Sequence, residues 1–225
     1  MRQYKYVIMC GGKYDIWETP RQLTKINGET LIERTIRLLK DNHIDSNHIY
    51  VSTNNEKIFD YCADSKKVTA FIYWTQKNNW VVPRPGVSTG DWCDCFCMTD
   101  VADVCYLMGD VVFSPKAIQT IVRTHTDDIE FFASAPPFAD NYSKPYAEPF
   151  AFKVHDNRHL QRAIAETKKL YRAEKFNRPP IAWEFWQVVK ETPINHIDYT
   201  NYTAINDYTC DIDEPKDIKK FEGAE

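Results

Sequence analysis

The first predicted strand lies in Tyr4-Lys5-Tyr6-Val7-Ile8-Met9-Cys10-Gly11-Gly12, where an apolar run ends at two glycines. Glycine has no Cβ, so the backbone after such a strand can lie against a ligand and direct its N–H groups at anionic oxygens. A basic stretch, Pro20-Arg21-Gln22-Leu23-Thr24-Lys25, precedes a helix that is expected to open near Gly28-Glu29. The pattern predicts phosphate binding, with a tight strand-to-helix turn as the alternative. The expected phosphate-binding residues are Cys10, Gly11, Gly12, Lys13, Arg21 and Lys25.

The composition indicates one globular α/β domain. The 225 residues are 43% hydrophobic and 27% charged, enough for one well-buried core. The net charge of −4 argues against a nucleic-acid surface, which needs a basic stripe. No stretch approaches membrane-spanning length and no signal region is evident, so we expect a cytoplasmic protein without membrane insertion. The seven cysteines are expected as reduced thiols, because the chain is large for a disulfide scaffold.

Strands and helices alternate along the sequence. The apolar run Val104–Met108 is typical of a parallel strand covered on both faces. Helices between such strands predict a three-layer α/β/α, Rossmann-like sandwich with a mixed, mostly parallel sheet. Residues 1–225 are expected to form one domain, with a nucleotide-binding part at about 1–135 and an acceptor-binding lobe at about 136–210. Further strands are expected at 48–52, 68–74, 129–135 and 148–154, and helices at 29–41, 56–64, 91–102, 159–171, 181–189 and from Ser114-Pro115 and Glu214-Pro215.

Two acidic segments carry the candidate metal ligands. Asp110 follows a buried strand in Met108-Gly109-Asp110, at the end of the sheet where open α/β proteins bind ligands. Asp213 lies in Asp211-Ile212-Asp213-Glu214-Pro215, where alternation places Asp211 and Asp213 on one side. Mg²⁺ needs only a few carboxylates besides water and phosphate oxygens. A turn cap at Asp110 and a helix cap at Asp213 are the alternatives.

The order of these segments resembles that of nucleotidyltransferases with the nucleotide-diphospho-sugar transferase fold. The resemblance spans nearly the whole chain and extends from the glycine loop through Gly28-Glu29-Thr30-Leu31-Ile32 to the closing acidic segment. The superfamily includes sugar-phosphate nucleotidylyltransferases, cytidylyltransferases for phosphocholine and methylerythritol phosphate, and the molybdenum-cofactor guanylyltransferase. The resemblance implies that Gly11, Gly12 and Arg21 hold a triphosphate and that Asp110 and Asp213 bind Mg²⁺.

The segment Lys13–Glu18 departs from the family pattern, which usually continues with another glycine and an arginine. Lys13 and Lys25 supply charge in place of that arginine, or the loop binds phosphate poorly and the protein has another activity. The second reading leaves open a non-catalytic nucleotide-binding homologue. A glycosyltransferase with a nucleotide-sugar donor is a further alternative, but its usual Asp-x-Asp is absent from Gly109-Asp110-Val111-Val112.

The implied activity is Mg²⁺-dependent transfer of NMP to a small phosphorylated acceptor, with release of pyrophosphate. The short chain and the Pro20-Arg21-Gln22-Leu23 match favour CTP as the donor, for activation of a surface-polymer or lipid precursor. Arg21, Lys25 and Asp110 are the expected catalytic residues, and a homodimer is compatible with the sequence. Thr53 and Ser88-Thr89-Gly90 are expected to contact base or ribose, although capping explains them equally well.

Acceptor contacts are expected in the less regular second half. Trp183 and Trp186 form either an aromatic surface that binds an apolar or cationic group of the acceptor or part of the hydrophobic core. The cysteines of Cys93-Asp94-Cys95-Phe96-Cys97 are expected to be buried thiols, because positions i and i+2 of a helix diverge. The candidate acceptor residues are Lys144, Glu148, Arg162, Arg178, Trp183 and Glu184.

Overall fold

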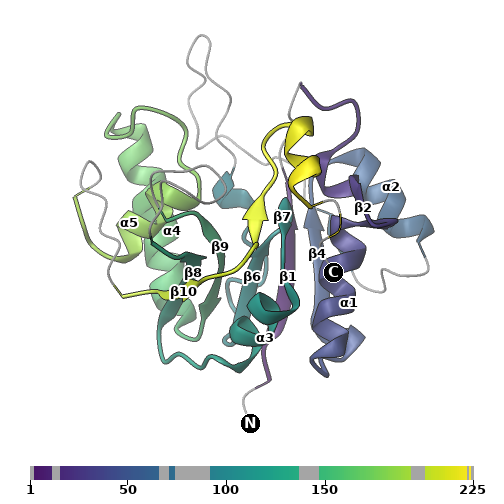
Figure 1. Ribbon diagram of the computed structural model, residues 1–225. Helices are drawn as coiled ribbons and strands as arrows, with labels where there is room; N and C mark the ends of the chain where they lie inside the picture. The colour runs from purple at the N-terminus through teal and green to yellow at the C-terminus, as the bar shows by residue number, and fades with distance from the viewer. Residues whose placement is uncertain are drawn as a thin grey trace.

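The computed structural model describes residues 3–11, 16–65, 71–73, 92–136, 147–193, 201–221 and 223. At its centre is a seven-stranded sheet in the order β10-β8-β9-β6-β1-β4-β5 (Figure 1). β9 runs antiparallel to β6 and β8, and the other pairs in the sheet are parallel, so the predicted mixed, mostly parallel sheet is confirmed. The strands are β1 Lys5–Cys10, β4 Ile49–Thr53, β5 Phe71–Tyr73, β6 Val104–Met108, β8 Ile129–Ser134, β9 Pro149–Val154 and β10 Thr203–Ile205.

Local capping sets the start of most helices. Thr30 and Glu33 form a reciprocal capping box at the start of α1. Ser114 caps α3 by accepting a hydrogen bond from the Ala117 N–H, and Pro115 occupies the first turn. The helices are α1 Leu31–Asp41, α2 Glu56–Asp64, α3 Pro115–Arg123, α4 Asn157–Arg172 and α5 Ala182–Val189, with 3₁₀ turns η1 Arg21–Leu23, η2 Ser46–His48, η3 Trp92–Cys95 and η4 Pro215–Phe221.

Two neighbouring residues of β9 show that helices cover both faces of the sheet. Phe152 packs against Phe185 of α5, with ring centroids 5.7 Å apart. Lys153 points the opposite way, and its Nζ donates to the carbonyls of Val122 at 2.9 Å and Thr124 at 2.7 Å, at the end of α3. Because successive strand side chains face opposite sides, α3 and α5 lie on opposite faces. The predicted three-layer α/β/α sandwich is therefore confirmed (Figure 1).

The core lies between these layers. β6 is buried at every position, as its continuous apolar sequence predicted. In α1, the side chains that face the sheet are buried and include Ile32, Ile36 and Leu39. A second, smaller apolar cluster joins the N-terminal and C-terminal segments. It comprises Ile26, Leu31, Val112, Cys210, Ile212 and Phe221, with Trp17 and Tyr208 packed against it.

The helix predicted over 91–102 is wrong in its length. The described part of that segment contains only the single 3₁₀ turn Trp92–Cys95. Met98 has a φ of 61°, a left-handed conformation that a continuing α-helix does not allow. Aromatic packing also fixes the chain here, because Phe96 contacts Phe185 at 4.9 Å between ring centroids. Cys93 and Cys95 are nevertheless buried, as predicted, and Cys97 is half-buried.

Other boundaries shift by one to three residues. The helix expected from Gly28-Glu29 begins at Leu31, because Asn27 and Gly28 both have positive φ and turn β2 (Lys25–Ile26) back onto β3 (Glu29–Thr30). The closing helix is a 3₁₀ turn, η4. The sequence analysis missed β7 (Val111–Val112) and β11 (Cys210–Asp211), a two-stranded antiparallel pair.

Strands from the predicted nucleotide-binding and acceptor-binding parts share the seven-stranded sheet, because β8 comes from the first part and β9 and β10 from the second. The division into these parts remains a prediction.

All seven cysteines are free thiols. Burial raises the pKa of Cys62 to about 11 and that of Cys105 to about 12. The described ranges contain no helix with the length and apolar character needed to span a membrane.

Candidate active site

The candidate site lies where the central parallel strands end. Cys10, the last residue of β1, pairs with Thr53, the last residue of β4. Met9 pairs with Met108, the last residue of β6. Because parallel strands end at the same edge, Gly11 and the Gly109-Asp110 turn leave the sheet side by side. Gly11, where the predicted glycine loop begins, and the predicted acidic turn therefore meet at one edge.

Gly109 allows the turn after β6 to press against the end of β1. Its N–H donates to the Met9 carbonyl at 3.0 Å. A Cβ at position 109 would lie 2.5 Å from the Met9 carbonyl oxygen and 2.6 Å from the Cys10 Sγ. Glycine is required by this close approach rather than by an unusual backbone angle. The contact fixes Asp110 beside the first loop.

The β7–β11 pair brings Asp213 to Asp110. Cys210 pairs with Val112 and Asp211 with Val111, so the C-terminal segment runs back along the residues that follow Asp110. The Ile212 N–H then donates to the Asp110 carbonyl at 3.0 Å. Figure 1 shows the yellow C-terminal strand beside β7 at this edge. Two acidic segments that are distant in sequence thereby converge.

Arg21 links the two acidic residues. Its Nη2 forms an ion pair with Asp110 Oδ2, and its Nη1 lies 3.2 Å from Asp213 Oδ1. Nη1 also donates to the Ile212 carbonyl at 3.0 Å. The Arg21 side chain is 6% exposed, whereas Asp110 and Asp213 are 20% and 53% exposed. One buried guanidinium therefore neutralises part of the charge of two carboxylates at the edge of the site.

Asp217 caps the turn that carries Asp213. Its Oδ2 accepts the N–H groups of Asp213 at 3.1 Å and Glu214 at 2.9 Å, and its Oδ1 pairs with Lys220 at 2.9 Å. Burial raises the pKa of Asp217, but the hydrogen bonds from the Glu214 and Asp213 N–H groups and the Lys220 ammonium outweigh this and leave it below its usual value. Asp217 thus performs capping that the sequence analysis considered for Asp213.

Two contacts fix the described end of the atypical loop. The Trp17 indole Nε1 donates to the Asp213 carbonyl at 3.0 Å. On the other side, Lys57 Nζ donates to the Glu18 carbonyl at 3.0 Å. Trp17 also packs against the smaller apolar cluster. The described end of the loop, residues 16–18, is therefore attached directly to the segment that bears Asp213.

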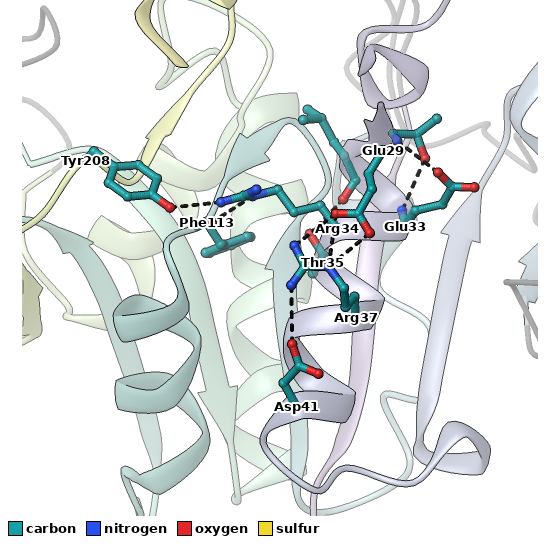
Figure 2. Close-up of polar contacts among 10 residues, drawn as sticks. Glu29, Glu33, Arg34, Thr35, Arg37, Asp41, Phe113 and Tyr208 are labelled. Atoms are coloured by element: carbon teal, nitrogen blue, oxygen red, sulfur yellow. Dashed lines mark hydrogen bonds and ion pairs between the residues drawn. The ribbon is translucent and has the colours of Figure 1, made fainter. Parts of the chain in front are cut away.

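Arg34 holds the C-terminal segment against the first helix. Its Nε donates to the Phe113 carbonyl at 3.2 Å, and its Nη2 donates to the Tyr208 hydroxyl at 2.8 Å (Figure 2). Thr209 and Asp207 extend the connection to the start of α3, because Thr209 Oγ1 accepts the Ser114 N–H and Asp207 accepts the Ser114 hydroxyl. These contacts lie just before β11 and position the segment that ends at Asp213.

Cys10 and Thr53 use their polar groups within the protein. The Thr53 hydroxyl donates to the Cys10 carbonyl at 2.7 Å and accepts the Asn55 N–H at 3.0 Å. The Cys10 thiol is fully buried. Burial, with smaller effects of Cys62 and Asp110, holds the pKa of Cys10 well above its usual value, so the thiol stays protonated at neutral pH. Both residues join the ends of β1 and β4.

The other predicted nucleotide contacts are only partly visible. Lys25 is exposed on β2. Gly11 follows β1 directly and is half-buried. Several predicted residues lie outside the described ranges: Gly12, Lys13, Ser88, Thr89, Gly90 and Lys144.

Four of the predicted acceptor residues lie in three separate places. Glu148 precedes β9 and exchanges hydrogen bonds with Ser134, which places it at the same edge of the sheet as Asp110. Glu184 pairs with Arg178 at 2.7 Å and caps Ile181 at the start of α5. Arg162 is exposed on α4.

The two tryptophans belong to the core. Trp186 is fully buried and stacks on Phe131, with ring centroids 4.9 Å apart, and Trp183 is 8% exposed. The reading of Trp186 as core is therefore confirmed, and its side chain forms no wall exposed to a ligand. Trp183 packs beside it at 5.9 Å between centroids.

Three residues that position the site were not predicted from the sequence: Trp17, Arg34 and Asp217. Asp217 follows Glu214-Pro215 at the spacing of a capping carboxylate, so its role had a signal in the sequence. Arg34 and Trp17 had none, because their contacts join residues that lie 79 to 196 positions apart in the sequence.

The carboxylates suit a hard divalent cation. Within the part of the chain that the structure describes, no three His, Cys, Asp or Glu side chains gather as a metal cluster. Asp110 and Asp213 both pair with the same guanidinium, so both carboxylates face one cationic group. Mg²⁺ binds through one or two carboxylates plus water and phosphate oxygens. The chemistry of the two carboxylates therefore fits a hard divalent cation such as Mg²⁺.

No protein-family model matches the sequence, and no curated protein is similar enough to match it. Solved structures do match. LicC, a CTP:phosphocholine cytidylyltransferase from Streptococcus pneumoniae, is 17% identical and has a TM-score of 0.53 over 99% of both chains. The inositol-1-phosphate CTP transferase from T. maritima is 10% identical, with a TM-score of 0.55 over 98% of this chain and 96% of that one.

Rv0371c from Mycobacterium tuberculosis H37Rv, whose structure is a complex with manganese, is 13% identical and has a TM-score of 0.53 over 100% of both chains. These likenesses extend over the central sheet and the C-terminal segment alike, since nearly the whole of each chain is covered. Together with the mixed sheet and its two helical layers, they show that the chain has the nucleotide-diphospho-sugar transferase fold.

Proposed function

We propose that the protein is a nucleotidyltransferase that moves NMP from a nucleoside triphosphate to a small phosphorylated acceptor. The observation that carries the proposal is the convergence of Arg21, Asp110 and Asp213 at the edge where the glycine loop leaves β1. The fold supports the same activity, because LicC and the T. maritima protein are named as transferases that use CTP.

The proposed reaction is an in-line displacement. An oxygen of the acceptor phosphate attacks the α-phosphorus, a new P–O bond forms, and the bond to the bridging oxygen breaks as pyrophosphate leaves. The acceptor phosphate is already ionised near neutral pH, so the reaction needs neither a covalent intermediate nor a strong base. The protein contributes position and charge.

The proposed role of Arg21 and Lys25 is to stabilise the negative charge of the triphosphate. A guanidinium can form two parallel hydrogen bonds to phosphate oxygens, and Arg21 already presents Nη1 and Nη2 to anionic oxygens at the site. Lys25 lies on the exposed β2 hairpin four residues further on. Cationic hydrogen-bond donors stabilise a transition state most strongly where negative charge develops. In this reaction that charge develops on the leaving pyrophosphate. Lys13 has the same proposed role.

Asp110 and Asp213 are the residues proposed to hold Mg²⁺. When bound, Mg²⁺ supplies positive charge that screens the acceptor and nucleotide phosphates from one another. Gly109 holds Asp110 in place through its contact with Met9, and Asp217 holds Asp213 through the N–H groups of the turn. Both carboxylates thus sit on rigid supports, as a preorganised site requires.

CTP is the proposed donor. The proposed acceptor-binding site includes Glu148, which lies at the same edge of the sheet as Asp110. A glycosyltransferase is less well supported. The second aspartate of its usual motif would fall at position 112, where Val112 is fully buried in β7.

The test is pyrophosphate release from CTP, UTP, GTP and ATP with Mg²⁺, each combined with phosphocholine, aminoethylphosphonate or a sugar phosphate. A reaction without acceptor serves as the control for simple hydrolysis. We expect acceptor-dependent pyrophosphate with CTP as the best donor. Absence of pyrophosphate in every combination would reject the proposal. Consumption of a nucleotide sugar in a parallel assay would establish the glycosyltransferase alternative.

A further inference from the structure

The carboxylates proposed to bind metal already hold a cation that belongs to the protein. Arg21 Nη2 pairs with Asp110, and Nη1 lies 3.2 Å from Asp213 Oδ1. Nη1 also donates to the Ile212 carbonyl at 3.0 Å. The guanidinium thus lies between the two carboxylates, and its side chain is 6% exposed.

A divalent cation and this guanidinium compete for the same oxygens. Both are attracted by Asp110 and Asp213, and two positive charges a few ångströms apart repel each other. The three side chains carry a summed charge of −1, whereas the two carboxylates alone carry −2. The site therefore attracts metal less strongly while Arg21 remains between them.

A phosphate group offers Arg21 an alternative partner. The arginine fork matches two phosphate oxygens as well as it matches carboxylates. The loop that is proposed to bind phosphate starts at Gly11, directly beside the Gly109-Asp110 turn. Gly11, the described start of the predicted phosphate site, is therefore next to the turn that carries Asp110.

We infer that Arg21 is an internal counter-cation that keeps metal off the Asp110–Asp213 pair until a triphosphate draws its guanidinium away. This inference rests on the proposed function and specifies the order in which the ligands bind. Metal binds the free protein weakly and binds tightly once nucleotide is present. By linkage, each ligand then raises the affinity for the other. The binding sites for metal and triphosphate are coupled through one side chain.

The test measures Mn²⁺ binding to the full chain without nucleotide, from the electron paramagnetic resonance signal of free Mn²⁺. Arg21→Gln keeps a side chain of similar length but removes the charge. We expect it to bind Mn²⁺ about tenfold or more tightly than the parent, because a unit charge beside a divalent ion is removed. The matched control is Arg37→Gln, which removes a guanidinium paired with Glu29 and Asp41 on α1 (Figure 2). Its Mn²⁺ affinity is expected to equal that of the parent.

Two further variants keep the test decisive. Adding Asp110→Asn to Arg21→Gln is expected to abolish the gain, which assigns the metal to this carboxylate. Arg21→Lys serves as a second variant in case Arg21→Gln does not fold. Lysine keeps the charge but cannot form two parallel hydrogen bonds to both carboxylates, so we expect its Mn²⁺ affinity to exceed that of the parent by a few fold. Mn²⁺ affinity unchanged from the parent in every folded Arg21 variant would overturn the inference.

The result is independent of turnover. If the parent transfers nucleotide but Arg21 variants gain no Mn²⁺ affinity, the inference fails and the proposed function stands. If the variants gain affinity but no nucleotide is transferred by the parent, the counter-cation role stands and the proposed function fails.

Discussion

Substitution of Gly109 by alanine tests how the acidic turn is held against β1. The new Cβ would lie 2.5 Å from the Met9 carbonyl oxygen, and real Cβ contacts are not found below 3.0 Å. The turn or the end of β1 must therefore shift by about 0.5 Å, the difference between these distances. Overpacking of this kind costs about 1–3 kcal/mol of stability. Because a displacement of about 1 Å at a reacting group costs roughly a hundredfold in rate, we expect about tenfold lower turnover.

The assay combines urea unfolding with pyrophosphate release. Gly28→Ala is the control, since its Cβ would contact no atom within 4 Å but would be strained by a φ of +86°, so it should lose stability without a comparable loss of turnover. Cys10→Ala removes the second clash, with Sγ at 2.6 Å, but leaves the one with the Met9 carbonyl, so it should rescue Gly109→Ala only in part. Wild-type stability and turnover in Gly109→Ala would refute the close approach.

The remaining predictions concern the C-terminal acidic segment. Asp213→Asn should raise the Mg²⁺ concentration needed for half-maximal turnover. The thermal midpoint of unfolding should change little, because Asp217 caps η4. A lowered midpoint with an unchanged Mg²⁺ titration would show that Asp213 has a structural role instead. The pKa of Asp217 is lowered in the folded protein, so its contribution to stability is present above the unfolded-state pKa of about 3.9 and is lost as the pH falls through the lower folded-state value. Asp217→Asn should therefore be less stable at neutral pH and lose less stability on acidification; parallel pH profiles in urea unfolding would contradict this.

The sequence predicted the elements whose signals are local. β6 followed from its continuous apolar run, and α3 began where Ser114 and Pro115 indicated. The strand-end position of Asp110 followed from the same reasoning. These features depend on neighbours in the chain, which a single sequence displays.

Features that depend on distant partners were beyond the sequence. The β7–β11 pair joins segments about a hundred residues apart and contains only two residues in each strand, too few for an alternation to be visible. The bridge from Arg21 to both carboxylates depends on that pairing. The segment around η3 is fixed by contacts of Trp92 and Phe96 with Phe185 of α5, a partner about ninety residues away that the sequence does not reveal.

The most direct test of the account is pyrophosphate release by Asp110→Asn at saturating CTP and Mg²⁺ with the best acceptor of the panel. The side chain is isosteric and 20% exposed, so the fold should be retained, as the circular dichroism spectrum can show. Loss of one preorganised electrostatic group predicts turnover lower by about a hundredfold or more. A folded Asp110→Asn protein with near-parental turnover would contradict the assignment of this edge of the sheet as the active site.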